Sequence, residues 1–428
     1  MQLGRHARIS GALAAASQAL VNPAQATVLG EEADWRYEAA LLYYGEEDDR
    51  VSAIEGRLQA SATDADGRRL QLALTLDSLT GATPTGAVPQ TAPQTFTRPS
   101  GRGEYVVAPG QTPLDDTFKD TRLQLNAGWA TPLARNWETD LAAHLSKEYD
   151  YLSLGLSAGL TRSLNRNNTQ LRLGGSAFFD TIEPEGRVPL PLATMPLRAD
   201  YDSEEAFANA FAATRGNRTD HKRTAELTLG LTQTLTRTLV MQVNYGLAEI
   251  SGYQSDAFKL LSVVDDSGTA LRQLYESRPR RRTKHTLFWQ AKAHFGAPVL
   301  DASYRYLHDD WGIDSHTLDL RLNTRLAPGH SLEPQFRFYR QSAADFYRPF
   351  LEADTPLPQH ASADYRLAKM DTYTLGLKYA LPVQGNEAHL RLSYYWQRPE
   401  GPAGPGQLSR LELYPEVRAL ILQLGYRF

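Results

Sequence analysis

The chain ends on Leu420-Ile421-Leu422-Gln423-Leu424-Gly425-Tyr426-Arg427-Phe428, and this stretch decides the fold. Every second residue carries a large apolar or aromatic side chain: Leu420, Leu422, Leu424, Tyr426 and Phe428. Successive side chains of a β-strand point to opposite faces of the sheet, so a period of two predicts a strand with one apolar face. The stretch therefore predicts a final strand whose apolar face packs either on a soluble core or on lipid.

Upstream segments repeat the same pattern, and this favours the alternative in which the apolar face packs on lipid. Arg122 to Trp129 reads Arg-Leu-Gln-Leu-Asn-Ala-Gly-Trp, and His389 to Trp396 alternates in the same way. About ten alternating residues are enough for a membrane-spanning strand. The sequence predicts 16 such strands, which begin near residues 35, 49, 68, 120, 137, 150, 168, 223, 238, 283, 298, 313, 330, 370, 387 and 416.

The lengths of the connections alternate as well. Long connections follow many odd-numbered strands, at residues 79–116, 180–222, 251–282, 342–369 and 399–415. Tight turns follow even-numbered strands, among them residues 64–67, 131–136 and 327–329. Long loops on one side and short turns on the other are typical of a transmembrane up-and-down β-barrel. An even strand number then puts both termini on the short-turn side, which is the periplasmic side.

The face opposite the leucines is too polar for a dry core. An unpaired ion buried without water costs several kcal/mol, so a face this charged indicates a hydrated lumen. We predict a lumen lined by Arg122, Arg172, Lys292, Arg305, Asp319, Arg321, Arg325, Arg337, Lys378 and Arg391.

Composition sets further limits on a chain of 428 residues. The mean hydropathy is −0.44, and the sequence has no apolar run long enough for a membrane-spanning helix. Membrane-spanning strands remain possible, because they need only about ten alternating residues. Without cysteine, disulfides, thiolate metal sites and cysteine nucleophiles are excluded. The net charge of −4 gives no electrostatic reason to bind nucleic acid.

Residues 1–26 have the features of a secretory signal peptide. Arg5 and Arg8 precede a moderately apolar stretch, and Ala24-Gln25-Ala26 supplies a cleavage pattern of small residues. A buried N-terminal helix is the alternative. We therefore expect a signal peptide followed by a single barrel domain at residues 27–428, located in the bacterial outer membrane.

Several phrases link the chain to a known family. Examples are Leu41-Leu42-Tyr43-Tyr44-Gly45-Glu46, Asp115-Asp116-Thr117-Phe118-Lys119-Asp120, Asp309-Asp310-Trp311-Gly312 and Ala361-Ser362-Ala363-Asp364-Tyr365-Arg366. Over about residues 35–428 the chain resembles a proteobacterial family of predicted outer-membrane proteins that is known only as a domain of unknown function. The resemblance implies a barrel and no established activity or site. It also implies a setting near periplasmic flavin-transfer and thioredoxin-like proteins.

The C-terminus resembles the closing strand of outer-membrane barrels, where Leu424, Tyr426 and Phe428 would form the signal for the barrel-assembly machinery.

Acidic residues gather at the predicted outer ends of the strands. This extracellular rim comprises Asp77, Asp115, Asp116, Glu148, Asp150, Asp345 and Asp364. Carboxylates of this kind ligate Ca²⁺ or Mg²⁺, and the sequence suggests no cofactor other than metal ions. The alternative is that they pair with Arg278 and Arg280–Arg282 to order the loops, with divalent cations bridging the rim to lipopolysaccharide.

A second cluster combines histidine with aspartate: His308, Asp309, Asp310, Asp314 and His316. Such residues could bind a transition metal or activate a water molecule for hydrolysis. The alternative is a capped hairpin with histidines at the membrane interface, because the alternation places His316 on the outward face.

Taken together, these features favour a pore or pore-like transport scaffold whose arginines select small anionic solutes. Two other functions stay open. One is a structural or docking component of a periplasmic redox or metal-handling system, and the other is a hydrolase at the rim. Outer-membrane lipid, lipopolysaccharide and the assembly machinery are the expected partners.

Overall fold

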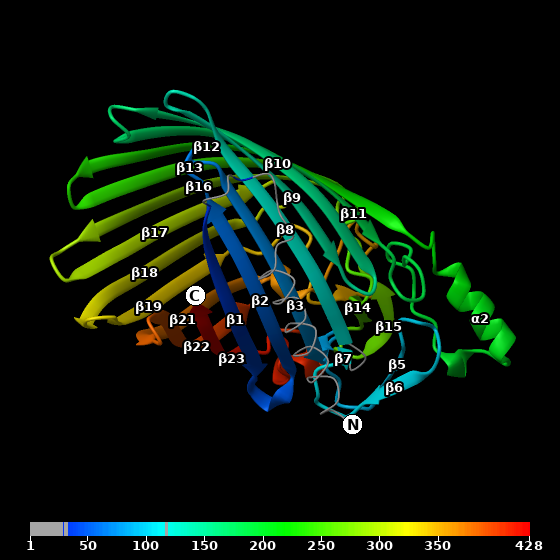
Figure 1. Ribbon diagram of the computed structural model, residues 1–428. Coiled ribbons are helices and arrows are strands. Elements are labelled where there is room, and N and C mark those ends of the chain that lie inside the picture. Colours follow the sequence, from blue (N-terminus) through cyan, green and yellow to red (C-terminus); the bar gives the residue numbers. More distant parts are fainter. Residues whose placement is uncertain (1–28, 30–32, 116–118) are drawn as a thin grey trace.

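A computed structural model describes Leu29, residues 33–115 and residues 119–428. The predicted signal peptide and Asp116 lie outside these residues. Sixteen antiparallel strands form a closed barrel, as predicted, and the last strand pairs with the first (Figure 1). The barrel strands are β1 (Asp34–Glu46), β2 (Val51–Thr63), β3 (Arg69–Gly81), β8 (Lys119–Ala134), β9 (Trp137–Lys147), β10 (Tyr151–Leu164), β11 (Thr169–Ile182), β12 (Asp220–Thr236), β13 (Leu239–Gly252), β16 (Arg281–His294), β17 (Pro298–Asp309), β18 (Asp314–Ala327), β19 (His330–Gln341), β21 (Lys369–Val383), β22 (Asn386–Glu400) and β23 (Val417–Arg427).

The outer surface of the barrel is apolar. Leu154, Leu156 and Leu375 expose 48%, 69% and 60% of their surface, and each lies on the face opposite the charged side chains. Such exposure is unfavourable in water and expected in hydrocarbon. The chain is therefore an outer-membrane type of β-barrel. No helix in the described part of the chain is long and apolar enough to cross a membrane.

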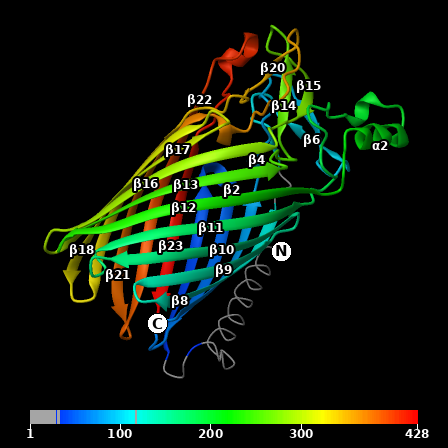
Figure 2. The same cartoon turned by 90° about the horizontal axis from the view of Figure 1, so that it is seen from above.

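The two ends of the barrel differ as the sequence predicted. Turns of a few residues, such as residues 135–136 and 384–385, join the strands at one end, and both termini of the barrel lie there (Figure 2). Long connections lie at the other end. One predicted turn, residues 131–136, is wrong in its extent. Strand β8 continues to Ala134 because Pro132 sits beside an irregularity in the pairing with β9, where a proline is tolerated.

The sequence had led us to expect plain loops in the long connections. The structure shows strands and helices there instead. We call residues 82–115, 183–219, 253–280, 342–368 and 401–416 the cap. Its elements are β4 (Thr83–Pro84), β5 (Gln94–Thr97), β6 (Glu104–Val107), β7 (Leu114–Asp115), β14 (Leu260–Val264), β15 (Ala270–Tyr275), β20 (Leu351–Glu352), α2 (Glu204–Ala213) and short helices, among them η3 (Tyr365–Leu367).

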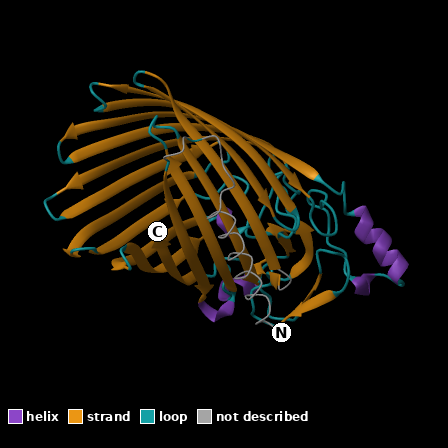
Figure 3. Cartoon of the chain, in the orientation of Figure 1, coloured by secondary structure: helices purple, strands orange, loops and turns teal. Residues whose placement is uncertain are grey.

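The cap has apolar cores of its own. Strands β15, β14 and β20 form a small sheet, in which Leu261 and Leu274 are almost completely buried. Phe96 and Leu408 are buried in neighbouring clusters. Figure 3 shows these strands and loops gathered at the long-loop end of the barrel, with α2 projecting from them. The cap is thus a folded layer at one mouth of the barrel.

The barrel closes through the aromatic residues at the C-terminal end of the chain, which pair with β1. Phe428 and Tyr37 exchange two backbone hydrogen bonds of 2.9 Å, and their rings stack with centroids 5.6 Å apart. Tyr426 also stacks with Phe428, with ring centroids 5.7 Å apart. The terminal aromatic therefore fastens β23 to β1 at the short-turn end.

We expect Phe428→Ala to lower the yield of folded barrel in the outer membrane several-fold, because two aromatic contacts of roughly 1 kcal/mol each are lost at the closing seam. The amount of heat-modifiable protein on unboiled gels measures this yield. Phe295→Ala is the matched control, since Phe295 is 64% exposed and lies at a turn away from the seam. An equal loss in both variants would contradict a special role for the terminal residue.

Candidate functional site

One wall of the lumen is strongly basic. On β16 to β22 the alternation turns the predicted lumen residues Lys292, Arg305, Arg321, Arg325, Arg337, Lys378 and Arg391 away from the exposed leucines. Only Asp301, Asp319 and Glu333 are acidic side chains on the middle part of this wall, among the described residues. A solute in the lumen would therefore meet a net positive surface on this side.

The basic wall contains a cavity of about 220 Å³. Arg305, Arg321 and Arg337 all line it, together with Asp319. Asp319 is held in place, because it forms an ion pair with Arg321 at 2.9 Å and accepts a hydrogen bond from Gln335 at 2.8 Å. The guanidinium of Arg305 lies 5.5 Å from the centre of the Phe288 ring. The cavity is small, polar and bordered by more positive than negative groups.

Four cationic side chains on this wall are not neutralised by an ion pair with a described carboxylate. In the part of the chain that the structure describes, no ion pair joins Arg305, Arg325, Arg337 or Lys378 to a carboxylate. Arg391 differs, since it binds Glu333 at 2.9 Å and Gln335 at 2.6 Å. Lys292 also differs, with Asp301 at 3.3 Å.

The predicted lumen residues on the other wall are neutralised. Arg122 binds Asp77 at 2.7 Å, and Glu55 lies 3.8 Å away. Arg172 forms a bidentate pair with Asp140. The positive charge of the lumen is therefore concentrated on β16 to β22.

The His/Asp cluster does not form one set of ligands. His308, Asp314 and His316 lie on the outward face of β17 and β18, where Asp314 accepts hydrogen bonds from Tyr306 at 2.6 Å and from His308 at 3.0 Å. His316 bonds instead to the outward Tyr304, at 2.7 Å. Period-two alternation turns Asp309 to the opposite face. The five residues therefore cannot converge on one ion or one water molecule.

Asp309 has a structural contact network. Its carboxylate is fully buried, pairs with Arg282 and accepts the backbone N–H groups of Trp311 and Ile313 at 3.0 Å. Asp310 accepts the backbone N–H of Thr283 at 2.9 Å. This geometry is that of the capped hairpin, the second alternative that the sequence allowed.

The predicted acidic rim is dispersed among different partners. Asp77 belongs to the Arg122 pair, Asp115 is buried in β7, and Asp345 is exposed beside Gly312. Asp364 is buried within the cap, and among the rim residues that the structure describes only Glu148 and Asp150 lie near each other.

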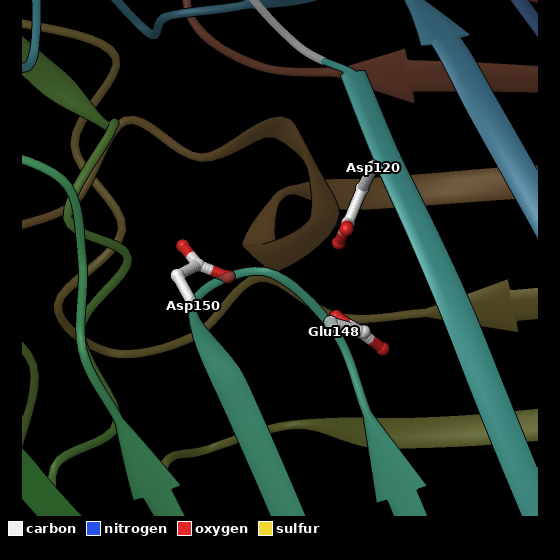
Figure 4. Close-up of side chains that lie close together, drawn as sticks. All are labelled: Asp120, Glu148 and Asp150. Atoms are coloured by element: carbon white, nitrogen blue, oxygen red, sulfur yellow. The ribbon is translucent and has the colours of Figure 1, made fainter.

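Glu148 and Asp150 meet Asp120, which the sequence analysis had not selected. Ligand oxygens of the three residues lie within 4.8 Å of one another, at the long-loop end of β8, β9 and β10 (Figure 4). Burial, followed by the nearby charge of Asp120, raises the pKa of Glu148 to about 7. The same two causes raise the pKa of Asp150. The group can share protons or accept a cation, and metal binding there stays a prediction.

This raised pKa has a testable consequence. Because the folded pKa of Glu148 exceeds its ordinary value of 4.5, the folded arrangement is favoured at low pH and loses stability as the pH rises from about 4.5 through about 7. We expect hydrogen exchange of residues 148–150, corrected for intrinsic rates, to increase by roughly tenfold between pH 5 and pH 8, since one pKa unit is worth 1.36 kcal/mol before solvent screening.

Glu148→Gln should reduce this pH dependence to the part that Asp150 contributes, whereas Glu47→Gln, at an exposed position between β1 and β2, should leave it unchanged. If Ca²⁺ occupies the three carboxylates, millimolar Ca²⁺ restores protection at pH 8 in the wild type only. Exchange that is independent of pH in the wild type would contradict the assignment.

The cap contains a buried ion network. Arg278 pairs with Glu276 and Asp364, both at 2.7 Å, and the two carboxylates have no exposed surface. Arg366 binds Asp364 and reaches Asp256, also at 2.7 Å. Burial alone would raise the pKa of Asp364, but Arg366 holds it well below its usual range. Burial raises the pKa of Glu276 although Arg278 opposes the shift.

This network ties distant parts of the cap together. Arg278, Glu276 and Asp256 lie in residues 253–280, and Asp364 and Arg366 lie in residues 342–368. Pairing of rim acids with Arg278 was one of the alternatives that the sequence allowed. Glu276 and Asp256 were not predicted as partners, because residues within irregular loops follow no fixed period.

A family model described as "Protein of unknown function (DUF3570)" matches residues 10–428. No curated protein matches the chain in sequence. Several hundred chains of solved structures resemble it, and the three described next do so at low identity.

The ferric enterobactin receptor PfeA of Pseudomonas aeruginosa is 9% identical, with a TM-score of 0.43, over 92% of this chain and 59% of that one. CdiB from Acinetobacter baumannii is 8% identical, with a TM-score of 0.42, over 92% of this chain and 60% of that one. The outer membrane protein OpdK of P. aeruginosa is 10% identical, with a TM-score of 0.40, over 93% of this chain and 99% of that one. The chain thus spans about six tenths of the length of the first two.

Proposed function

The chain belongs to the DUF3570 family of proteins of unknown function, and we propose that it is a capped outer-membrane pore that passes small anionic solutes. The basic wall of the lumen supplies the selectivity, and the cap controls access from the long-loop end, which we take to face the outside of the cell. Both barrel termini then face the periplasm.

The observation that carries the proposal is the cavity between Arg305, Arg321 and Arg337. Arginine presents up to five N–H donors and stays charged at any physiological pH, so a carboxylate or phosphate oxygen is the natural ligand of such a cavity. The side chains of Arg305 and Arg337 are exposed to the lumen, which leaves them free to exchange one anion for the next. Exchange of this kind is what conduction requires.

The cap supports controlled rather than permanent opening. Its apolar cores and its ion network make it a folded unit, and the barrel beneath has 16 strands, a number that in porins leaves an aqueous channel. We therefore expect a low resting conductance that increases when the cap is released.

Reversal potentials in planar bilayers test the proposal. Under a tenfold KCl gradient, the purified wild-type barrel should show currents that prefer chloride over potassium. A clear cation preference would refute the anion selectivity. Folded barrel that carries no current even after the cap is loosened would refute the pore itself. If such a barrel co-purified with a periplasmic redox or metal-handling protein, the docking function would replace the pore.

A further inference from the structure

The outward wall formed by β8 to β13 is hollowed along its length. Two adjoining hollows of about 990 Å³ and 1180 Å³ lie on this wall, whose strands run side by side in Figure 2. Both are lined by Ala143, Leu156 and Ala177, so they form one continuous furrow. Small outward residues make the wall recede there, and these are Ala127, Ala143, Ala158, Gly175, Ala177 and Ala225.

The length and the apolar lining of the furrow are suited to binding an acyl chain. On β11 it runs from Leu173 to Phe179, which at about 3.3 Å per residue is roughly 20 Å. One leaflet of a bilayer has a hydrocarbon depth of roughly 15 Å. Leu154, Leu156 and Leu173 are exposed along it, so its sides are apolar and unpartnered within the chain.

The end of the furrow nearest the cap is basic. Arg223, Ser251 and Arg281 form one outward row across the adjacent strands β12, β13 and β16, and all three are exposed. In the described part of the chain neither arginine has an ion-pair partner, and Arg223 lies 5.8 Å from the centre of the Phe179 ring. With strands about 4.8 Å apart, the two arginines are separated by roughly 10 Å, so their side chains can converge on one group.

We propose that this furrow binds a membrane lipid with a phosphorylated headgroup, of the lipid A type. Arg223, Ser251 and Arg281 hold the phosphate by charge-assisted hydrogen bonds, and a saturated acyl chain lies along the furrow. Charge complementarity selects this occupant. A second copy of the chain would present further arginines to Arg223 and Arg281 in a two-fold contact, which is unfavourable.

In this proposal Glu249 fixes the orientation of the lipid headgroup and limits the site to one phosphate. It lies one row nearer the middle of the membrane, next to Ala225 and Thr283, and is exposed. A carboxylate there accepts hydrogen bonds from hydroxyl or amide groups beside the phosphate. It also repels a second phosphate, so one phosphate per site is expected.

Native mass spectrometry of the full-length barrel with added lipid A tests the headgroup. The double variant Arg223→Ala, Arg281→Ala should lower retained lipid A at least tenfold. Arg340→Ala is the matched control, because Arg340 is also an outward arginine at the same end but is paired with Asp371 at 2.7 Å. Dephosphorylated lipid A should bind the wild type and the double variant equally. Inorganic phosphate alone should not compete, since the furrow contributes through the acyl chain.

A second pair of variants tests the furrow. Ala177→Trp should weaken binding of both lipid A and its dephosphorylated form, whereas Ala302→Trp, on the outward wall at β17, should leave both unchanged. Heat-modifiable mobility confirms folding in each case. Unchanged lipid retention in the double arginine variant, or an equal loss with Arg340→Ala, would overturn the proposal.

Discussion

Arg278→Met will release the cap while leaving the barrel folded. The substitution keeps an unbranched side chain but removes the charge that faces the fully buried carboxylates of Glu276 and Asp364. Removing one partner of a buried ion pair costs about 3–5 kcal/mol, because the remaining charge is left without compensation. The effect falls on the cap alone, since none of these residues belongs to a barrel strand.

The expected result is a large increase in opening of the cap. At about 1.4 kcal/mol per factor of ten, a cost of 3–5 kcal/mol raises the open population by a factor between roughly 10² and several thousand. Limited proteolysis within residues 253–280 and 342–368 measures this population, and single-channel conductance measures its effect on the pore. The barrel should keep its heat-modifiable mobility throughout.

A neighbouring arginine provides the control. Arg280 pairs with Asp220 at 2.8 Å, but its side chain is 59% exposed. Exposed pairs contribute about 0–1 kcal/mol, so Arg280→Met should change proteolysis little. Adding Glu276→Gln to Arg278→Met should restore part of the protection, because one uncompensated charge is then removed. Equal effects of the two arginine substitutions would contradict the role of the network.

The barrel could be predicted from the sequence because the polarity of its strand residues alternates with a period of two. Each membrane strand must alternate lipid-facing and water-facing side chains, and that rule is visible in every segment from Trp35 to Phe428. The same rule predicted that His316 faces outward, and it divides the His/Asp cluster between two faces. An inference from residue type alone had grouped His308 with Asp309, although adjacent strand positions cannot share a site.

The cap could not be predicted in the same way. Leu260-Leu261-Ser262-Val263-Val264 is a strand buried on both faces, so it lacks alternation and was interpreted as part of a loop. Asp120 was missed for a different reason. It meets Glu148 because β8 and β9 form a hairpin with its turn at residues 135–136, whereas the predicted turn covered residues 131–136, so the facing positions at the far end of the hairpin were not identified.

Replacement of Arg305 and Arg337 by glutamine will shift the ion selectivity of the pore towards cations. Both side chains line the cavity in the basic wall and lack an ion pair with any described carboxylate. Glutamine keeps hydrogen-bond donors on a shorter side chain, and the change that acts on a permeating ion is mainly the loss of charge. A unit charge 4 Å away in water is worth about 1 kcal/mol, and loss of even one such interaction changes the permeability ratio roughly fivefold.

The sign of the shift separates selectivity from simple damage to the channel. Arg340→Gln, three residues from Arg337 on the same strand but on the outward face, should leave the reversal potential unchanged. Asp319→Asn removes a negative charge from the same cavity, so it should shift selectivity the opposite way, towards anions. A damaged lumen would lower all currents without this reversal of sign. If both lumen substitutions moved the reversal potential in one direction, the charge of the wall would not be what selects the solute.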